Sequence, residues 1–172
     1  MSKPEGLDAE QLAAYFALMD VGSLLRHAVE GHLRTEGGLS YVQFEILARL
    51  ADTPSGQQRM TDLADGVVYS RSGLTYQADR LENAGLIARE PSNDDERSTT
   101  VTITAAGRKL LAHVMPGHIQ IARQMLLDPL DRRDIATLAD VLGRVRDRMR
   151  AAPPRSAAPR GRRVSGGGPA AT

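Results

Sequence analysis

The side chains with the clearest chemistry gather near the start of one predicted helix. Its polar residues are Ser70, Arg71, Ser72, Thr75, Tyr76 and Arg80. The apolar residues Leu74, Ala78 and Leu81 recur at helical spacing, so the polar set occupies the opposite face. Arginine can hold a guanine edge with two hydrogen bonds, hydroxyls can reach bases or phosphates, and the free N–H groups of a helix start favour a phosphate. This face is a candidate DNA contact.

A β-hairpin is predicted directly after this helix. Residues 86–90 and 99–104 alternate in polarity, the second run is β-branched, and residues 91–96 form a polar turn between them. Arg97 falls near the tip of this hairpin. An arginine there is placed to enter a neighbouring minor groove, where the negative potential is enhanced. On the preceding helix, Asp79 is expected to orient an arginine rather than to read a base.

The flanking segments predict further helices. Asp8 with Gln11, and Ser40 with Gln43, have the spacing of a capping box at a helix start. The expected helices cover residues 8–36, 40–52, 61–67, 70–84, 104–127 and 131–150. Two short helices joined by a tight turn and followed by a hairpin indicate a winged helix-turn-helix. The predicted fold is therefore mainly α, with a small β-hairpin wing.

The run from Ser70 to Leu111 resembles the winged-helix core of the MarR (multiple antibiotic resistance regulator) family. The matching motifs, in chain order, are Asp79-Arg80-Leu81-Glu82, Gly85-Leu86-Ile87, Asp95-x-Arg97 and Ile103-Thr104-x-x-Gly107-Arg108. Each motif alone is weak, but their order and spacing together are specific. With the flanking helices, the resemblance covers about residues 8–150.

This resemblance implies one MarR-like domain over residues 1–150, in which dimerisation helices at 8–35 and 105–150 flank a winged helix-turn-helix at 39–104. It also implies a homodimer that binds pseudo-palindromic double-stranded DNA and regulates transcription, more often as a repressor, with release by a small and often phenolic effector. The apolar residues expected in the dimer interface are Leu18, Leu25, Val114, Ile121, Met125, Leu138, Leu142 and Val145. An ordinary monomeric bundle is the alternative explanation of these apolar stripes.

The effector site is harder to place. In the family, effectors lie between the dimerisation helices and the winged unit, which makes Tyr15, Phe16, Tyr41 and His113 candidate lining residues. Core packing is the alternative role for each of them. The four histidines form two pairs five residues apart, a poor spacing for two ligands of one metal, so no metal site is predicted.

Composition excludes several classes of protein. The chain has 172 residues, a net charge of +1 and no cysteine, so disulfides, thiolate zinc sites and cysteine nucleophiles are absent. No glycine-rich phosphate loop or G-x-S-x-G elbow is present, and neither an enzyme nor a cofactor is predicted. We also expect no secretory signal, no membrane-spanning run and a cytoplasmic location.

Charge leaves one alternative function open. Residues 151–172 form a Pro/Gly/Ala/Arg-rich tail with four arginines and no acid, which is expected to be disordered and could bind phosphates weakly. The segment 60–108 holds five arginines and eight acidic residues, so its long-range attraction to DNA should be feeble. Glu96 and Tyr76 also stand where the family often has basic residues. A MarR-like dimer that has lost DNA affinity and binds a small molecule or a protein is therefore the alternative.

Overall fold

A computed structural model describes residues 6–67, 71–92 and 95–151, although the side chains of Arg71 and of residues 95–97 are outside that description. The elements are α1 (Ala9–Gly37), α2 (Tyr41–Asp52), β1 (Gln57–Arg59), α3 (Met60–Gly66), α4 (Arg71–Asn83), β2 (Ile87–Ser92), β3 (Asp95–Ile103), α5 (Ala105–Ala122), the π-helical turn η1 (Arg123–Leu127) and α6 (Arg132–Arg150). The prediction of a mainly helical fold with a small wing is confirmed. The predicted disordered tail lies outside the described residues.

Local side-chain chemistry explains where the first helices begin. The Asp8 carboxylate accepts from the Gln11 backbone N–H at 2.8 Å, and the Gln11 side chain accepts from the Asp8 N–H at 3.1 Å. Ser40 and Gln43 make the same reciprocal pair at the start of α2, at 3.3 and 2.9 Å. Both predicted capping boxes are confirmed, because each satisfies backbone donors that a helix start leaves without a partner.

The wing is a sheet of three strands in the order β1-β3-β2. Strand β3 pairs antiparallel with β2 along the predicted hairpin and with β1 on its other edge, where Gln58 lies opposite Val101. Strand β1 was not predicted because Gln57-Gln58-Arg59 has no apolar alternation. Its backbone pairing with β3 forms it, and it joins the loop after α2 to the wing.

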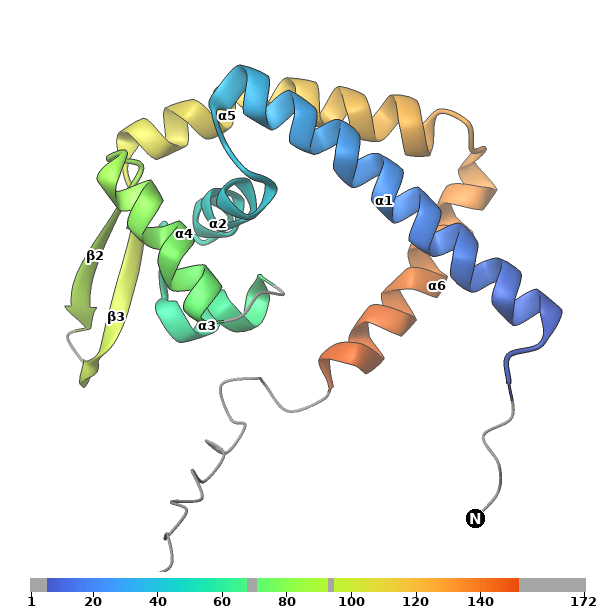
Figure 1. Cartoon of the computed structure of the whole chain (residues 1–172), viewed down its shortest axis with the longest axis horizontal. Coiled ribbons are helices and arrows are strands. Elements are labelled where there is room, and N and C mark those ends of the chain that lie inside the picture. The colour runs from blue at the N-terminus through green and yellow to red at the C-terminus, as the bar shows by residue number, and fades with distance from the viewer. Residues whose placement is uncertain (1–5, 68–70, 93–94, 152–172) are drawn as a thin grey trace, which may run out of the picture.

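One hydrophobic core joins the winged unit to the long helices. Its largest fully buried side chains are Leu33, Ile46, Leu47, Leu50, Leu63, Leu74, Leu81, Ile87, Val67, Val101 and Val114. Figure 1 shows α1 and α5 running side by side above α2, with the winged unit at one end and α6 leading away from the other. Val114 is fully buried inside this chain, so the prediction that it forms part of a dimer interface was wrong.

The first half of α1 and most of α6 carry apolar side chains that nothing in this chain covers. On α1 these include Tyr15, Phe16 and Leu24, the last 63% exposed, and on α6 they include Val145 and Met149. By length and composition alone, α1 is long and apolar enough to cross a membrane, contrary to the sequence-based expectation. The difference arises because charged residues are sparse over its first two thirds.

Candidate nucleic-acid interface

Helix α4 turns one face to the core and the other to solvent. Leu74, Ala78 and Leu81 are fully buried, as their spacing predicted. On the opposite face, Ser72, Thr75, Tyr76 and Arg80 are exposed. Because the core fixes the helix from one side, the polar side chains form a single surface next to the wing.

The other predicted contacts are described only in part. Ser70 lies outside the described residues, as do the side chains of Arg71 and Arg97. The backbone nevertheless places Arg71 at the first position of α4. It places Arg97 within β3, two residues after Asp95, the first residue of that strand. The fold thus brings these two positions to the helix start and the wing.

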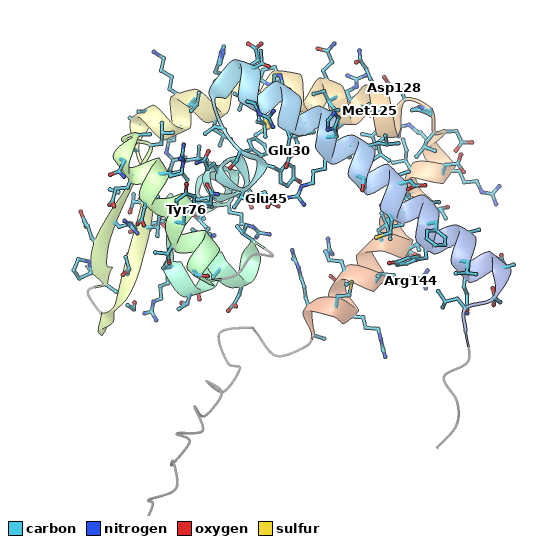
Figure 2. All side chains as sticks on the ribbon, viewed as in Figure 1. Glu30, Glu45, Tyr76, Met125, Asp128 and Arg144 are labelled. Atoms are coloured by element: carbon cyan, nitrogen blue, oxygen red, sulfur yellow. The ribbon has the colours of Figure 1, made fainter. Side chains whose placement is uncertain are left out.

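Tyr76 and Arg80 form a pair on the exposed face of α4. The Arg80 Nη1 donates a hydrogen bond to the Tyr76 hydroxyl at 3.3 Å, and the guanidinium lies 5.9 Å from the centre of the tyrosine ring. Tyr76 is 56% exposed and is labelled in Figure 2. A cation and an amphipathic ring one turn apart can offer both hydrogen bonds and an apolar contact to a base edge.

A residue that sequence reasoning did not single out connects this helix to the wing. The Arg89 guanidinium on β2 lies 2.6 Å from Asp79 Oδ1, and it donates to Glu82 Oε2 at 2.6 Å through Nη2 and at 3.0 Å through Nε. The Arg89 hydrogen bonds lower the pKa of Glu82, and the Glu82 carboxylate in turn raises the pKa of Arg89. Asp79 thus contacts an arginine, Arg89, as expected. That it does not read a base stays a prediction.

A signal for Arg89 was present in the strand alternation. Ile87 is buried, and because side chains two apart lie on the same face of a strand, Arg89 is on the core side. A cation on that side needs a carboxylate partner. The predicted strand covered this position, but its register against the preceding helix was not available from the sequence.

A hollow of about 380 Å³ lies between α1, the start of α2 and α4. Its lining residues are Glu30, Arg34, Gly38, Leu39, Ser40, Tyr41, Gln43, Tyr76, Gln77 and Arg80. The Arg26 guanidinium stacks 4.8 Å from the centre of the Tyr41 ring and pairs with Glu30 at 3.3 Å. Burial, followed by the nearby Glu45 carboxylate, raises the pKa of Tyr41.

The four candidate effector residues do not lie together. Tyr41 lines the hollow, whereas Tyr15 and Phe16 are exposed on α1, where their rings meet edge to face at 5.5 Å. His113 is exposed on α5 and does not line the hollow. Among the residues that the structure describes, no group of three or more His, Asp or Glu side chains could hold a metal ion.

The described elements define a winged helix-turn-helix protein, a class that presents one helix and one hairpin to nucleic acid. The MarR family model matches residues 39–99. The transcriptional regulator PecS of Dickeya dadantii is 30% identical over 146 residues, which are 81% of this chain and 83% of PecS. This chain therefore belongs to the MarR family of transcriptional regulators, and the prediction that it is not an enzyme is confirmed.

Two other relatives bear on the function. The transcriptional repressor YetL of Bacillus subtilis is 29% identical over 112 residues, 65% of this chain and 66% of YetL. The structure of Sco3205, a MarR family regulator from Streptomyces coelicolor in complex with DNA, is 28% identical with a TM-score of 0.79, covering 86% of this chain and 92% of Sco3205.

Proposed function

We propose that this regulator is a homodimeric, sequence-specific DNA-binding repressor of the cytoplasm, released from pseudo-palindromic duplex DNA by a small-molecule effector. The observation that carries DNA binding is the exposed face of α4, where Arg80 and Tyr76 stand beside a hairpin wing. The DNA complex of Sco3205 supports it, since that protein has the same fold at 28% identity. Repression rests on the resemblance to YetL, which is named as a repressor.

Charge on the winged unit shapes how such a protein binds. The segment 60–108 is net acidic, so a few well-placed cations must supply the contacts. Two of the acids, Asp79 and Glu82, are engaged by Arg89. We therefore expect Ser70, Arg71, Ser72, Thr75, Tyr76, Arg80 and Arg97 to make the DNA contacts, with a salt dependence set by the few cations among them.

Dimerisation is supported by the uncovered apolar faces of α1 and α6. Leu24 and Met149 are 63% and 74% exposed in the single chain, and their neighbours on the same faces are also apolar. Contiguous apolar surface of this kind marks an interface in soluble proteins. A two-fold dimer would set two recognition helices about 34–36 Å apart, one turn of DNA.

The hollow supports an effector site. Glu30 is engaged by Arg26, whereas Arg34 and Arg80 make no ion pair among the described residues, so the hollow is net positive. Tyr41 and Tyr76 supply aromatic walls, and its size suits a small molecule. We expect a small aromatic compound bearing an acidic group.

Selection from random-sequence duplexes at two salt concentrations tests the DNA-binding proposal. We expect a two-fold-symmetric motif. Arg80→Gln and Arg97→Ala should each weaken binding and lower the salt slope by about two, because the dimer carries each arginine twice. Arg144→Gln on α6 is the matched control, because it removes the same charge from an exposed pair far from the winged unit (Figure 2). Retention that is weak, blind to sequence and lost at modest salt would contradict the proposal and favour a ligand- or protein-binding module.

A further inference from the structure

Arg89 ties the wing to the recognition helix through contacts from both sides. Its guanidinium, 22% exposed, reaches Asp79 and Glu82 at 2.6 Å, and its backbone N–H donates to Glu82 Oε1 at 3.1 Å. Asp79 and Glu82 lie one turn apart on α4, and Arg89 lies in β2. One side chain therefore holds two carboxylates of a different element.

Stability alone is a weak explanation for this arrangement. The two carboxylates are 49% and 35% exposed, and ion pairs so close to solvent contribute little to folding. Leu81 on α4 and Ile87 on β2 are both buried in the core, so apolar contacts already hold the two elements there. The effect of Arg89 should be sought in the charge of the α4 surface.

Without Arg89, two unpaired carboxylates would flank the cation expected to contact DNA. Asp79 directly precedes Arg80, and Glu82 is two residues after it. Both would repel phosphates, and both would compete for the Arg80 guanidinium. With Arg89 in place, Arg80 bonds to the Tyr76 hydroxyl and makes no ion pair among the described residues.

We propose that Arg89 is a positioning residue for DNA binding: it engages Asp79 and Glu82, which leaves Arg80 available for the duplex and sets the recognition helix against the wing. This role rests on the proposed DNA-binding function. Arg89 does not itself contact DNA in this scheme, and the carboxylates act only through their contact with it.

The first test is Arg89→Gln, measured by fluorescence anisotropy on the selected duplex across a salt series. We expect affinity to fall about tenfold at fixed salt, and the salt slope to fall towards that of Arg80→Gln, because the unpaired carboxylates engage the Arg80 guanidinium. Arg80→Gln, which removes this cation from both subunits of the dimer, should lower the slope by about two. Arg89→Lys, which keeps the charge but not the planar fork, should bind between Arg89→Gln and the wild type.

The second test is rescue. Replacing both carboxylates in the same chain, as Asp79→Asn and Glu82→Gln, should bring Arg89→Gln back to within about threefold of wild-type affinity. A residue with only a structural role would show no rescue, since these changes restore no contact to position 89. Arg144→Gln, which breaks the exposed pair with Asp140, should leave affinity unchanged.

Hydrogen exchange without DNA separates this proposal from the proposed function. Arg89→Gln should raise exchange at the end of α4 and along β2, and leave α2 unchanged. If the wild type binds and Arg89→Gln binds with the same affinity, the positioning role alone is overturned. The same holds if Asp79→Asn and Glu82→Gln do not restore the affinity of Arg89→Gln. A salt slope that stays low when Arg89→Gln is combined with Asp79→Asn and Glu82→Gln also overturns it, because it means that Arg89 itself contacts a phosphate. A wild-type protein that retains no duplex overturns the proposed function, and the exchange data then decide whether Arg89 sets the helix against the wing.

Discussion

At Tyr76 the exposed face of α4 carries an aromatic ring rather than a second cation. The ring is exposed, and its hydroxyl accepts a hydrogen bond from Arg80. Tyrosine gives directional contact with little charge, whereas a second arginine would attract any phosphate. Tyrosine at this position should therefore give weaker binding to DNA in general, and binding that depends more on the base sequence, than arginine would.

Tyr76→Arg tests that expectation. We expect affinity for unrelated duplexes to rise and the salt slope to increase by about two, since each subunit of the dimer can neutralise one more phosphate. Tyr76→Phe is the control, because it removes only the hydroxyl and should leave the slope unchanged. Titrations of specific and unrelated duplexes across a salt series measure both, and an unchanged slope for Tyr76→Arg would place this residue away from the phosphates.

Residue types predicted the polar face of α4 well, because Leu74, Ala78 and Leu81 mark the buried side without reference to any other element. Arg89 was missed for the opposite reason. Its partners are 7 and 10 residues away in the chain, on an element whose packing against β2 depends on the whole core. The hollow was likewise unpredictable, since three separate segments line it.

At the scale of elements, helix starts were predictable and one strand was not. A capping box involves only residues three apart in the sequence, so Asp8 and Ser40 predicted the starts of α1 and α2. Strand β1 has polar side chains and exists through backbone pairing with β3, which no local pattern reveals. The close approach of α1 and α5 also depends on tertiary structure, and it gives two further predictions.

Gly117 on α5 faces the His32 imidazole of α1 so closely that an added methyl group would clash with the ring. His32 Nε2 also donates to the Val114 carbonyl at 2.8 Å, which restricts its retreat. Gly117→Ala should therefore lower the free energy of unfolding by about 1–3 kcal/mol. Gly31→Ala, where nothing lies within 4 Å, should raise it by about 0.5–1 kcal/mol. Urea unfolding measures both, and an equally stable Gly117→Ala would contradict the tight crossing.

His118 should make stability depend on pH. Burial, followed by the nearby His32, lowers the pKa of His118. Its ring packs 4.8 Å from that of Phe44, and its buried Nδ1 has no hydrogen-bond partner among the described residues. The unfolded chain therefore takes up the proton first as pH falls, and stability is full above the unfolded pKa of about 6.5 and lost below it.

We expect the free energy of unfolding to fall between about pH 7.5 and 5.5 more steeply in the wild type than in His118→Phe, which keeps an aromatic ring against Phe44. Urea titrations at a series of pH values give this slope. His113→Gln on the exposed side of α5 should behave as the wild type. If the free energy of unfolding falls with pH equally in the wild type and in His118→Phe, this histidine is not the source of the pH dependence.

At the scale of the whole molecule, the uncovered faces of α1 and α6 predict assembly. A charge placed among them should block it, because an unpaired carboxylate is costly in an apolar interface. Light scattering should give Val145→Asp a mass near the 18.6 kDa of one chain, and the wild type a mass twice as large. Arg144→Asp, outside the apolar stripe, should stay dimeric, and a wild-type protein with the mass of one chain would refute the dimer.

Helix α5 passes Pro116 and continues directly into η1, so one rod connects the wing to the start of α6. Its 18 residues span about 27 Å at 1.5 Å per residue. Turning such a rod by about 10° at its far end moves its near end by about 5 Å, more than the 3.4 Å rise of one base pair. In a dimer, a slight change in helix packing near η1 would therefore shift the two winged units enough that both no longer match the spacing of their DNA sites.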